Sequence, residues 1–231
     1  EVRRRVARQL RVGTRERAAT SAGASHRSRR HGRNVRGQWL ACCESHRGTP
    51  GKLKAGDTVL VLGTGGVSIF ALQFAKLMGA RVIATSSSNE KLERLRSLGA
   101  EHTINYRETP EWGKAVKALT DGKGVDHVIE VGGPSTLPQS IDAVKIGGHI
   151  SLIGILTGRE GDIPTAKLMA KQAKLQGLIV GSRRHQIEMI DAIEAANLKP
   201  IIDREFPLSE IAEAFRHQES GKHFGKICLT F

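Results

Sequence analysis

A glycine-rich loop between two patterned segments constrains the fold of this chain more than any other feature. The loop reads Gly63-Thr64-Gly65-Gly66-Val67-Ser68. The short apolar run that precedes it, residues 57–62, predicts a buried parallel strand. Apolar residues at helical spacing follow it over residues 67–78, and Gly79 stands where helices commonly end. We therefore expect a strand, a tight turn and a helix in direct succession.

The same unit of strand and helix recurs along the chain. Expected strands cover residues 57–62, 81–85, 101–105, 125–130, 149–153 and 177–180. Expected helices cover residues 67–78, 89–98, 111–120, 136–144, 164–174 and 184–196. This alternation predicts an α/β protein with a doubly wound parallel sheet of the Rossmann type. In such a sheet, ligands bind outside the carboxyl ends of the strands.

The glycine loop is a candidate phosphate site because of its place between the first strand and the first helix. Gly63 permits a sharp turn, Gly65 lets the backbone approach a pyrophosphate, and free N–H groups at the helix start attract negative charge. Ser68 replaces the third glycine of the motif, at a position that tolerates a small side chain. The loop predicts nucleotide binding by Gly63, Thr64, Gly65, Gly66 and Val67. The alternative is a turn that is merely structural.

The end of the second strand carries Ser86-Ser87-Ser88. NAD enzymes usually place there an acid that holds the ribose hydroxyls. No carboxylate here would repel a 2′-phosphate, and Lys91 follows with a charge that could pair with one. We expect NADP, with NAD still possible, and the missing acid argues against a methyltransferase. Under the alternative interpretation, the serines solvate a loop and Lys91 is one exposed charge among many.

The charge of the chain is uneven. The formal net charge is +13, but residues 1–50 alone hold 13 Arg, no Lys and 3 acidic residues. This segment has too few apolar residues to offset the entropy of ordering. We expect residues 1–50 to be disordered or translated out of frame. An arginine arm that binds nucleic acid is a further hypothesis, which we do not favour.

Several stretches in the rest of the chain resemble the medium-chain dehydrogenases/reductases. They are residues 53–68, Gly79-Ala80-Arg81-Val82-Ile83-Ala84, Lys91-Leu92, Leu98-Gly99-Ala100, Ile104-Asn105-Tyr106, Gly124-Val125-Asp126, Gly147-Gly148 and Gly225-Lys226-Ile227. The resemblance covers residues 51–231 and is closest to the zinc-independent branch of quinone oxidoreductases and alcohol-dehydrogenase-like proteins. It implies an NAD(P)-dependent oxidoreductase that transfers hydride between NADPH and a carbonyl, quinone, enone or alcohol.

The resemblance also implies further cofactor contacts. Lys91 and Tyr106 match positions that bind the 2′-phosphate, and Glu130 and Val131 match positions near the adenosine ribose or the nicotinamide. For Tyr106, an aromatic residue at a sheet edge is an equally plain interpretation. The segments expected to meet the nicotinamide amide are Gly154-Ile155-Leu156 and Leu178-Ile179-Val180. His223 matches, less closely, a cofactor contact late in the family's sequences.

The chain departs from that family in two ways. Relatives place a chaperonin-10-like barrel, which supplies most acid–base residues, where residues 1–50 stand here. We expect residues 51–203 to form the Rossmann domain and residues 204–231 to be the tail that normally completes the missing barrel, with Phe206, Ile211 and Phe215 exposed. No zinc pattern is present, since Cys42, Cys43 and Cys228 are isolated from a ligand set. We expect no bound zinc.

Two functions stay open: a truncated NADP-dependent oxidoreductase and a catalytically inactive dinucleotide-binding module. We expect a small-molecule substrate. The resemblance also implies a homodimer joined at the sixth strand region, Leu178 to Val180, although a strand covered by its own helix is an equally plain interpretation. No apolar run is long enough to span a membrane, and three cysteines make no disulfide framework. We therefore expect a cytoplasmic protein.

Overall fold

A computed structural model describes residues 53–179 and 181–230. The expectations for residues 1–50, including Cys42 and Cys43, lie outside the described residues, as does Val180. Within the described ranges, none of the helices combines the length and the apolar character needed to cross a membrane.

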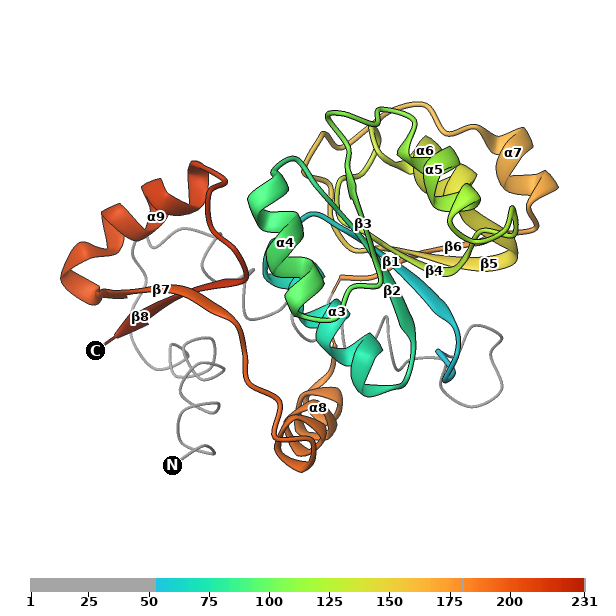
Figure 1. Ribbon diagram of the computed structural model, residues 1–231. Coiled ribbons are helices and arrows are strands. Elements are labelled where there is room, and N and C mark those ends of the chain that lie inside the picture. The colour runs from blue at the N-terminus through green and yellow to red at the C-terminus, as the bar shows by residue number, and fades with distance from the viewer. Residues whose placement is uncertain (1–52, 180, 231) are drawn as a thin grey trace.

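Six parallel strands form the central sheet in the order β3-β2-β1-β4-β5-β6 (Figure 1). The strands are β1 (Thr58–Leu62), β2 (Arg81–Ser86), β3 (His102–Asn105), β4 (Val125–Glu130), β5 (Val144–Leu152) and β6 (Lys174–Gly177). The helices that connect and follow them are α3 (Gly66–Leu77), α4 (Asn89–Ser97), α5 (Trp112–Ala118), α6 (Leu137–Ala143), α7 (Thr165–Ala170) and α8 (Arg183–Ala195). The order reverses between β1 and β4, and this confirms the doubly wound Rossmann-type sheet.

Two hydrophobic clusters hold the helices on opposite faces of the sheet. Helices α3, α4 and α8 pack on one face, where Phe74, Leu95 and Met189 are buried. Helices α5 and α6 cover the other face through Trp112 and Ile141, and α7 packs partly against the same cluster. Alternate residues of β1 point to each cluster, as expected of a strand buried on both faces.

The sixth strand and the helix before it differ from the prediction. We expected a helix over residues 164–174 and a strand over 177–180, but α7 ends at Ala170 and β6 begins at Lys174. Gln172 has a φ of 49°, a left-handed conformation that ends the helix early. β6 is an edge strand with a single neighbour, so it does not need the apolar run on which the prediction relied. β5 also begins five residues before the predicted start, at Val144.

The segment after the sheet forms a small separate unit, shown in orange and red in Figure 1. A parallel pair, β7 (Ile202–Pro207) and β8 (Lys226–Thr230), is joined by the 3-10 helix η2 (Leu208–Glu210) and by α9 (Ile211–Glu219). Ile211 is exposed as expected, and Phe215 is half-buried. The expectation for Phe206 was wrong: it is 6% exposed, and its ring lies 5.9 Å from the ring of His217.

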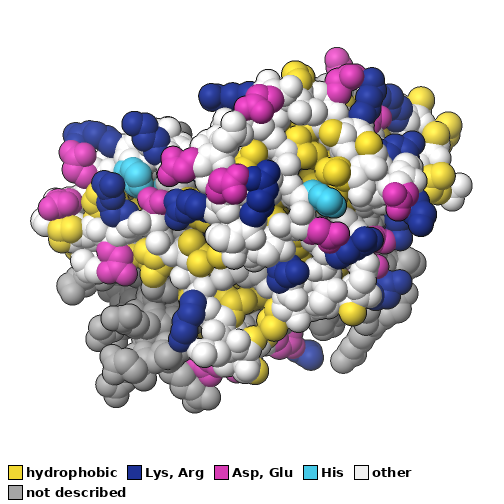
Figure 2. All heavy atoms as spheres, viewed as in Figure 1, with side chains coloured by type: hydrophobic (Ala, Val, Ile, Leu, Met, Phe, Trp, Pro, Cys, Tyr) yellow, Lys and Arg dark blue, Asp and Glu magenta, His cyan; other side chains and the backbone are white. Residues whose placement is uncertain are grey.

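On the face drawn in Figure 2, acidic and basic side chains are interspersed with apolar ones. This face therefore carries no continuous basic surface of the kind that nucleic-acid binding would need.

Candidate dinucleotide site

The glycine loop connects β1 to α3 at the carboxyl edge of the sheet. Gly63 has a φ of 73°, and its N–H donates to the carbonyl oxygen of Thr85 on β2 at 2.9 Å. Gly65 is the residue before α3, and no side chain of the described residues caps that helix. The N–H groups of the first helical turn are therefore available to an anionic ligand.

Ser68 stands where the dinucleotide-binding motif usually has its third glycine. The side chain is buried, and its hydroxyl donates to the carbonyl oxygen of Leu62 at 2.5 Å. The serine therefore fastens the first turn of α3 to the end of β1. This contact explains why the substitution is compatible with close packing of helix and strand.

Lys226 lies over the glycine loop, although it comes from β8. A methyl group added to Gly66 would lie 2.6 Å from Cδ and Cε of Lys226 and 2.8 Å from its Nζ. Burial lowers the pKa of Lys226 to about 8. In the sequence, this lysine is recognisable only as part of the stretch Gly225-Lys226-Ile227, which resembles the family. Its place beside the loop is seen only in the folded protein, where β8 lies next to the glycine loop.

Gly225, the residue before Lys226, holds the start of β8 against the glycine loop. Its N–H donates to the carbonyl oxygen of Thr64 at 2.9 Å, and Gly225 pairs with Gly65 in an isolated parallel bridge. Its φ is 85°, and a methyl group there would lie 2.5 Å from the carbonyl oxygen of Ile201. Only glycine meets both conditions.

The structure brings Ser86 and Tyr106 together at the ends of β2 and β3. Ser86 is buried, and its hydroxyl accepts from the N–H of Ser88 at 3.3 Å. The N–H of Tyr106 donates to the carbonyl oxygen of Ser86 at 3.1 Å, while the residue is 41% exposed. No carboxylate occupies the β2 end itself, in agreement with the sequence Ser86-Ser87-Ser88.

Lys91, in the first turn of α4, points toward the β7–β8 unit. Its Nζ donates to the carbonyl oxygens of Gly221 at 2.7 Å and His223 at 3.0 Å. Burial is the main cause that lowers the pKa of Lys91. Two of the three ammonium N–H groups are thus engaged within the protein, and one is left for a ligand.

Glu130, at the end of β4, has a structural arrangement of its own. The carboxylate is fully buried and accepts from the N–H groups of Gly132 at 2.8 Å and Gly133 at 3.1 Å. It also accepts from the hydroxyls of Thr136 at 2.6 Å and Ser140. The carboxylate of Glu130 thus accepts four hydrogen bonds that shape the turn into α6.

The remaining predicted residues gather at the carboxyl ends of β4, β5 and β6. The N–H groups of Ile153 and Gly154 donate to the carbonyl oxygen of Glu130 at 2.8 and 3.2 Å. A methyl group on Gly154 would lie 2.3 Å from the carbonyl oxygen of Val131. The structure therefore packs the two segments closely together. The N–H of Leu178 donates to the carbonyl oxygen of Leu152 at 2.9 Å and brings the third segment to the same edge.

This edge presents apolar side chains to solvent. Ile155, Leu156 and Ile179 are 53%, 83% and 85% exposed. Residues 131–134, 153–158 and 178–179 contain no titratable side chain. These segments can therefore position a flat ring system, but they cannot supply a general acid or base.

Residues 53–179 and 181–230 contain no group of three or more His, Cys, Asp or Glu side chains placed to hold a metal ion. Cys228 on β8 has a free thiol whose pKa is raised mainly by burial. The described residues thus do not fit a zinc site.

An open parallel sheet with this strand order and a glycine turn after β1 defines a dinucleotide-binding domain. Residues 66–195 match the zinc-binding dehydrogenase family. The chain belongs to this family of NAD(P)-dependent oxidoreductases, and it corresponds to the C-terminal cofactor-binding part of a medium-chain dehydrogenase/reductase.

Individual relatives agree with this assignment. A zinc-type alcohol dehydrogenase-like protein of Schizosaccharomyces pombe is 46% identical over 77% of this chain and 53% of its own length. The crystal structure of an NAD-dependent alcohol dehydrogenase superposes with a TM-score of 0.78 at 36% identity, over 86% of this chain and 56% of that one. A mycobacterial protein in complex with NADPH gives 0.71 at 26% identity, over 86% and 63%. The chain spans about half the length of the curated relatives it matches.

Proposed function

We propose that the protein is an NADPH-dependent oxidoreductase acting on a small carbonyl, quinone, enone or alcohol. The observation that carries the proposal is the convergence of the uncapped start of α3, the glycine turn at Gly63–Gly66 and the Lys226 ammonium. A diphosphate would meet backbone N–H groups and a cation at one place there. When bound, a nicotinamide cofactor supplies the hydride chemistry.

NADP is the preferred cofactor in this proposal, with NAD as the alternative. The β2 end offers the Ser86 hydroxyl instead of a carboxylate, and Lys91 keeps one N–H group for a phosphate oxygen. Tyr106 lies beside Ser86 with an exposed ring that could flank the adenosine end. The relatives do not decide the matter, because one structure is named for NAD and another contains NADPH.

Val131, Gly154, Ile155, Leu156, Leu178 and Ile179 would orient the nicotinamide ring in this proposal. The acid–base group would come from a part of the protein outside these apolar segments. These segments contain no titratable side chain, and this observation also favours the second candidate function, a dinucleotide-binding module without turnover. We further propose that the activity is independent of zinc, that the edge strand β6 joins two copies of the chain, and that the protein is cytoplasmic.

The test is a parallel titration of the chain with NADPH and NADH, followed by nicotinamide fluorescence. We expect tighter binding of NADPH, and we expect Ser86→Asp to weaken NADPH while sparing NADH. Ser86→Asn is the matched control, because it has similar volume and no charge. Equal affinities for the two cofactors, unchanged by Ser86→Asp, would contradict the NADP assignment.

Turnover separates the two candidate functions. A panel of aldehydes, quinones and enones would be tested with NADPH, with and without added zinc. Oxidation of NADPH without zinc supports the enzyme, whereas cofactor binding without turnover of any substrate supports the module.

A further inference from the structure

A second concavity lies at the end of the sheet opposite the glycine loop. It has a volume of about 610 Å³, and its lining residues come from the ends of α5, α6 and α7, from the residues after α5 and α7, and from the start of β5. These parts of the chain lie at the amino ends of β4, β5 and β6, whereas the glycine loop leaves β1 at its carboxyl end. The concavity is therefore separate from the candidate dinucleotide site.

The charged side chains that line this concavity are five lysines and one aspartate. They are Lys117, Lys123, Lys145, Lys167, Lys171 and Asp142. We call this site the lysine cleft. A cleft lined by one sign of charge concentrates the field and attracts counter-ions of the opposite sign.

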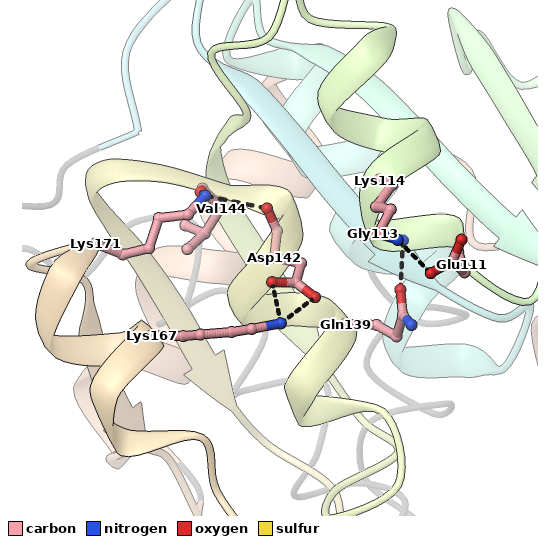
Figure 3. A network of polar contacts seen from close by, with 8 residues as sticks. All are labelled: Glu111, Gly113, Lys114, Gln139, Asp142, Val144, Lys167 and Lys171. Atoms are coloured by element: carbon pink, nitrogen blue, oxygen red, sulfur yellow. Dashed lines mark hydrogen bonds and ion pairs between the residues drawn. The ribbon is translucent and has the colours of Figure 1, made fainter.

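The only carboxylate among these lining residues is already engaged (Figure 3). Nζ of Lys167 lies 2.9 and 3.0 Å from the two carboxylate oxygens of Asp142, which ties α7 to α6. Nζ of Lys171 donates to the backbone carbonyl oxygens of Asp142 at 3.0 Å and of Val144. These contacts hold two of the ammonium groups in place before any ligand arrives.

The positive charge of the cleft is not balanced within the described residues. Lys145 forms an ion pair with Asp126, but Lys117 and Lys123 are exposed and have no acidic partner in the part of the chain that the structure describes. Burial lowers the pKa of Lys171, and the charge of Lys117 lowers it further. The lysines are thus close enough to repel one another, and a bound anion would relieve that repulsion.

The volume of the cleft suits a small ligand. Its volume lies in the range of roughly 300 to 1,000 Å³ that is usual for small-molecule sites. Ile146, which is 68% exposed, and Ala170 form an apolar part of the wall.

We propose that the lysine cleft binds a small molecule that carries two or more phosphate groups. Several ammonium groups can share a chain of phosphates, since each provides three N–H donors around a compact charge. The fixed pair Lys167 and Lys171 would form the base of the site. Lys117, in the last turn of α5, and Lys123, in the loop that follows, would contact the ligand from the other side. The proposal does not rest on the proposed oxidoreductase function.

The experiment is calorimetric titration of the full chain with inorganic tripolyphosphate at constant ionic strength. We expect binding that weakens at least tenfold in the double variant Lys117→Gln/Lys123→Gln. The matched control is Lys54→Gln/Lys199→Gln, which removes the same charge from two exposed lysines elsewhere. Both substituted pairs are exposed, so each variant should fold, and thermal melts verify this.

Three results would overturn the proposal. An equal loss of affinity in both double variants would show attraction to net charge alone. Loss of binding in Lys226→Gln would place the tripolyphosphate at the glycine loop. Binding of phosphatidylserine vesicles that depends on Lys117 and Lys123, without binding of tripolyphosphate, would assign the lysines to a membrane surface.

Discussion

At the scale of single residues, Lys226 links the tail of the chain to the site. Its side chain lies against Gly66, and burial has already lowered its pKa to about 8. An ammonium group with this pKa is half deprotonated near pH 8 and carries its full charge only well below that pH. Binding of a diphosphate would raise the pKa again, because the anion stabilises the charged form.

We predict that NADPH affinity is highest below pH 8. It should decline as the pH rises from 8 to the higher pKa that Lys226 has in the complex, and it should level off above that pKa. Lys226→Gln should remove this dependence and weaken binding roughly 10- to 100-fold, the usual worth of a charged hydrogen bond. Fluorescence titrations between pH 6 and 10 would test it, with Lys199→Gln as control. An unchanged Kd in Lys226→Gln would contradict the role.

Glu130 provides a second prediction at this scale. Glu130→Ala leaves the buried N–H groups of Gly132 and Gly133 without their acceptor, and we expect a loss of roughly 3 kcal/mol in the free energy of unfolding. Urea denaturation measures it. If the variant kept its stability but lost cofactor affinity, the main role of Glu130 would be to contact the cofactor and not to hold the turn.

At the scale of elements, the β7–β8 unit docks on the first two strand–helix units of the sheet. Lys91 holds the carbonyl oxygens of Gly221 and His223, and the guanidinium of Arg94 lies 4.0 Å above the ring centroid of Phe224. Both contacts come from α4, while the bond between Gly225 and Thr64 comes from the glycine loop. The position of Lys226 therefore depends on α4 as well as on β8.

We predict two effects of Lys91→Met, which keeps the aliphatic stem and removes the ammonium. Amide hydrogen exchange at Phe224 and Gly225 should become faster, because the loop before β8 loses its anchor. NADPH affinity should fall more than NADH affinity, since the N–H group available to a 2′-phosphate is lost. Equal losses of affinity for the two cofactors would show that Lys91 only holds the β7–β8 unit in place.

At the scale of the whole molecule, the sheet contains two buried histidines side by side. His127 on β4 pairs in register with His149 on β5, and their rings meet edge to face with centroids 6.0 Å apart. Burial, together with the charges of His127 and Lys174, lowers the pKa of His149 to about 4. The pKa of His127 is also lowered, again mainly by burial.

The pH dependence of stability follows from these directions. In the unfolded chain a histidine takes up a proton near pH 6.5, whereas His149 in the folded protein does so only near pH 4. Stability is therefore complete above pH 6.5 and falls as the pH drops toward 4, by about 3 kcal/mol at most. In urea titrations, His149→Phe should reduce this loss of stability between pH 6.5 and 4. His102→Gln, on the edge strand β3, should leave it unchanged.

The sequence predicted the sheet well because its strands are apolar and its turns carry glycine. β1, β2 and β4 lie within one residue of their predicted bounds, and the glycine loop is where it was expected. The errors at α7 and β6 arise where the chain is polar and where the left-handed residue after the helix is Gln172 instead of a glycine. Lys226 and the lysine cleft depend on contacts between distant segments, which no local pattern contains.

The bond between Thr64 and Gly225 also bears on the order of events when the chain folds. It joins the first turn of the sheet to the last strand described, so closing it costs more loop entropy than any pairing of neighbouring strands. Helical circular dichroism should therefore recover before nicotinamide fluorescence does in a refolding experiment started by dilution from urea. Between those two times, the chain would have its sheet without the means to hold a cofactor.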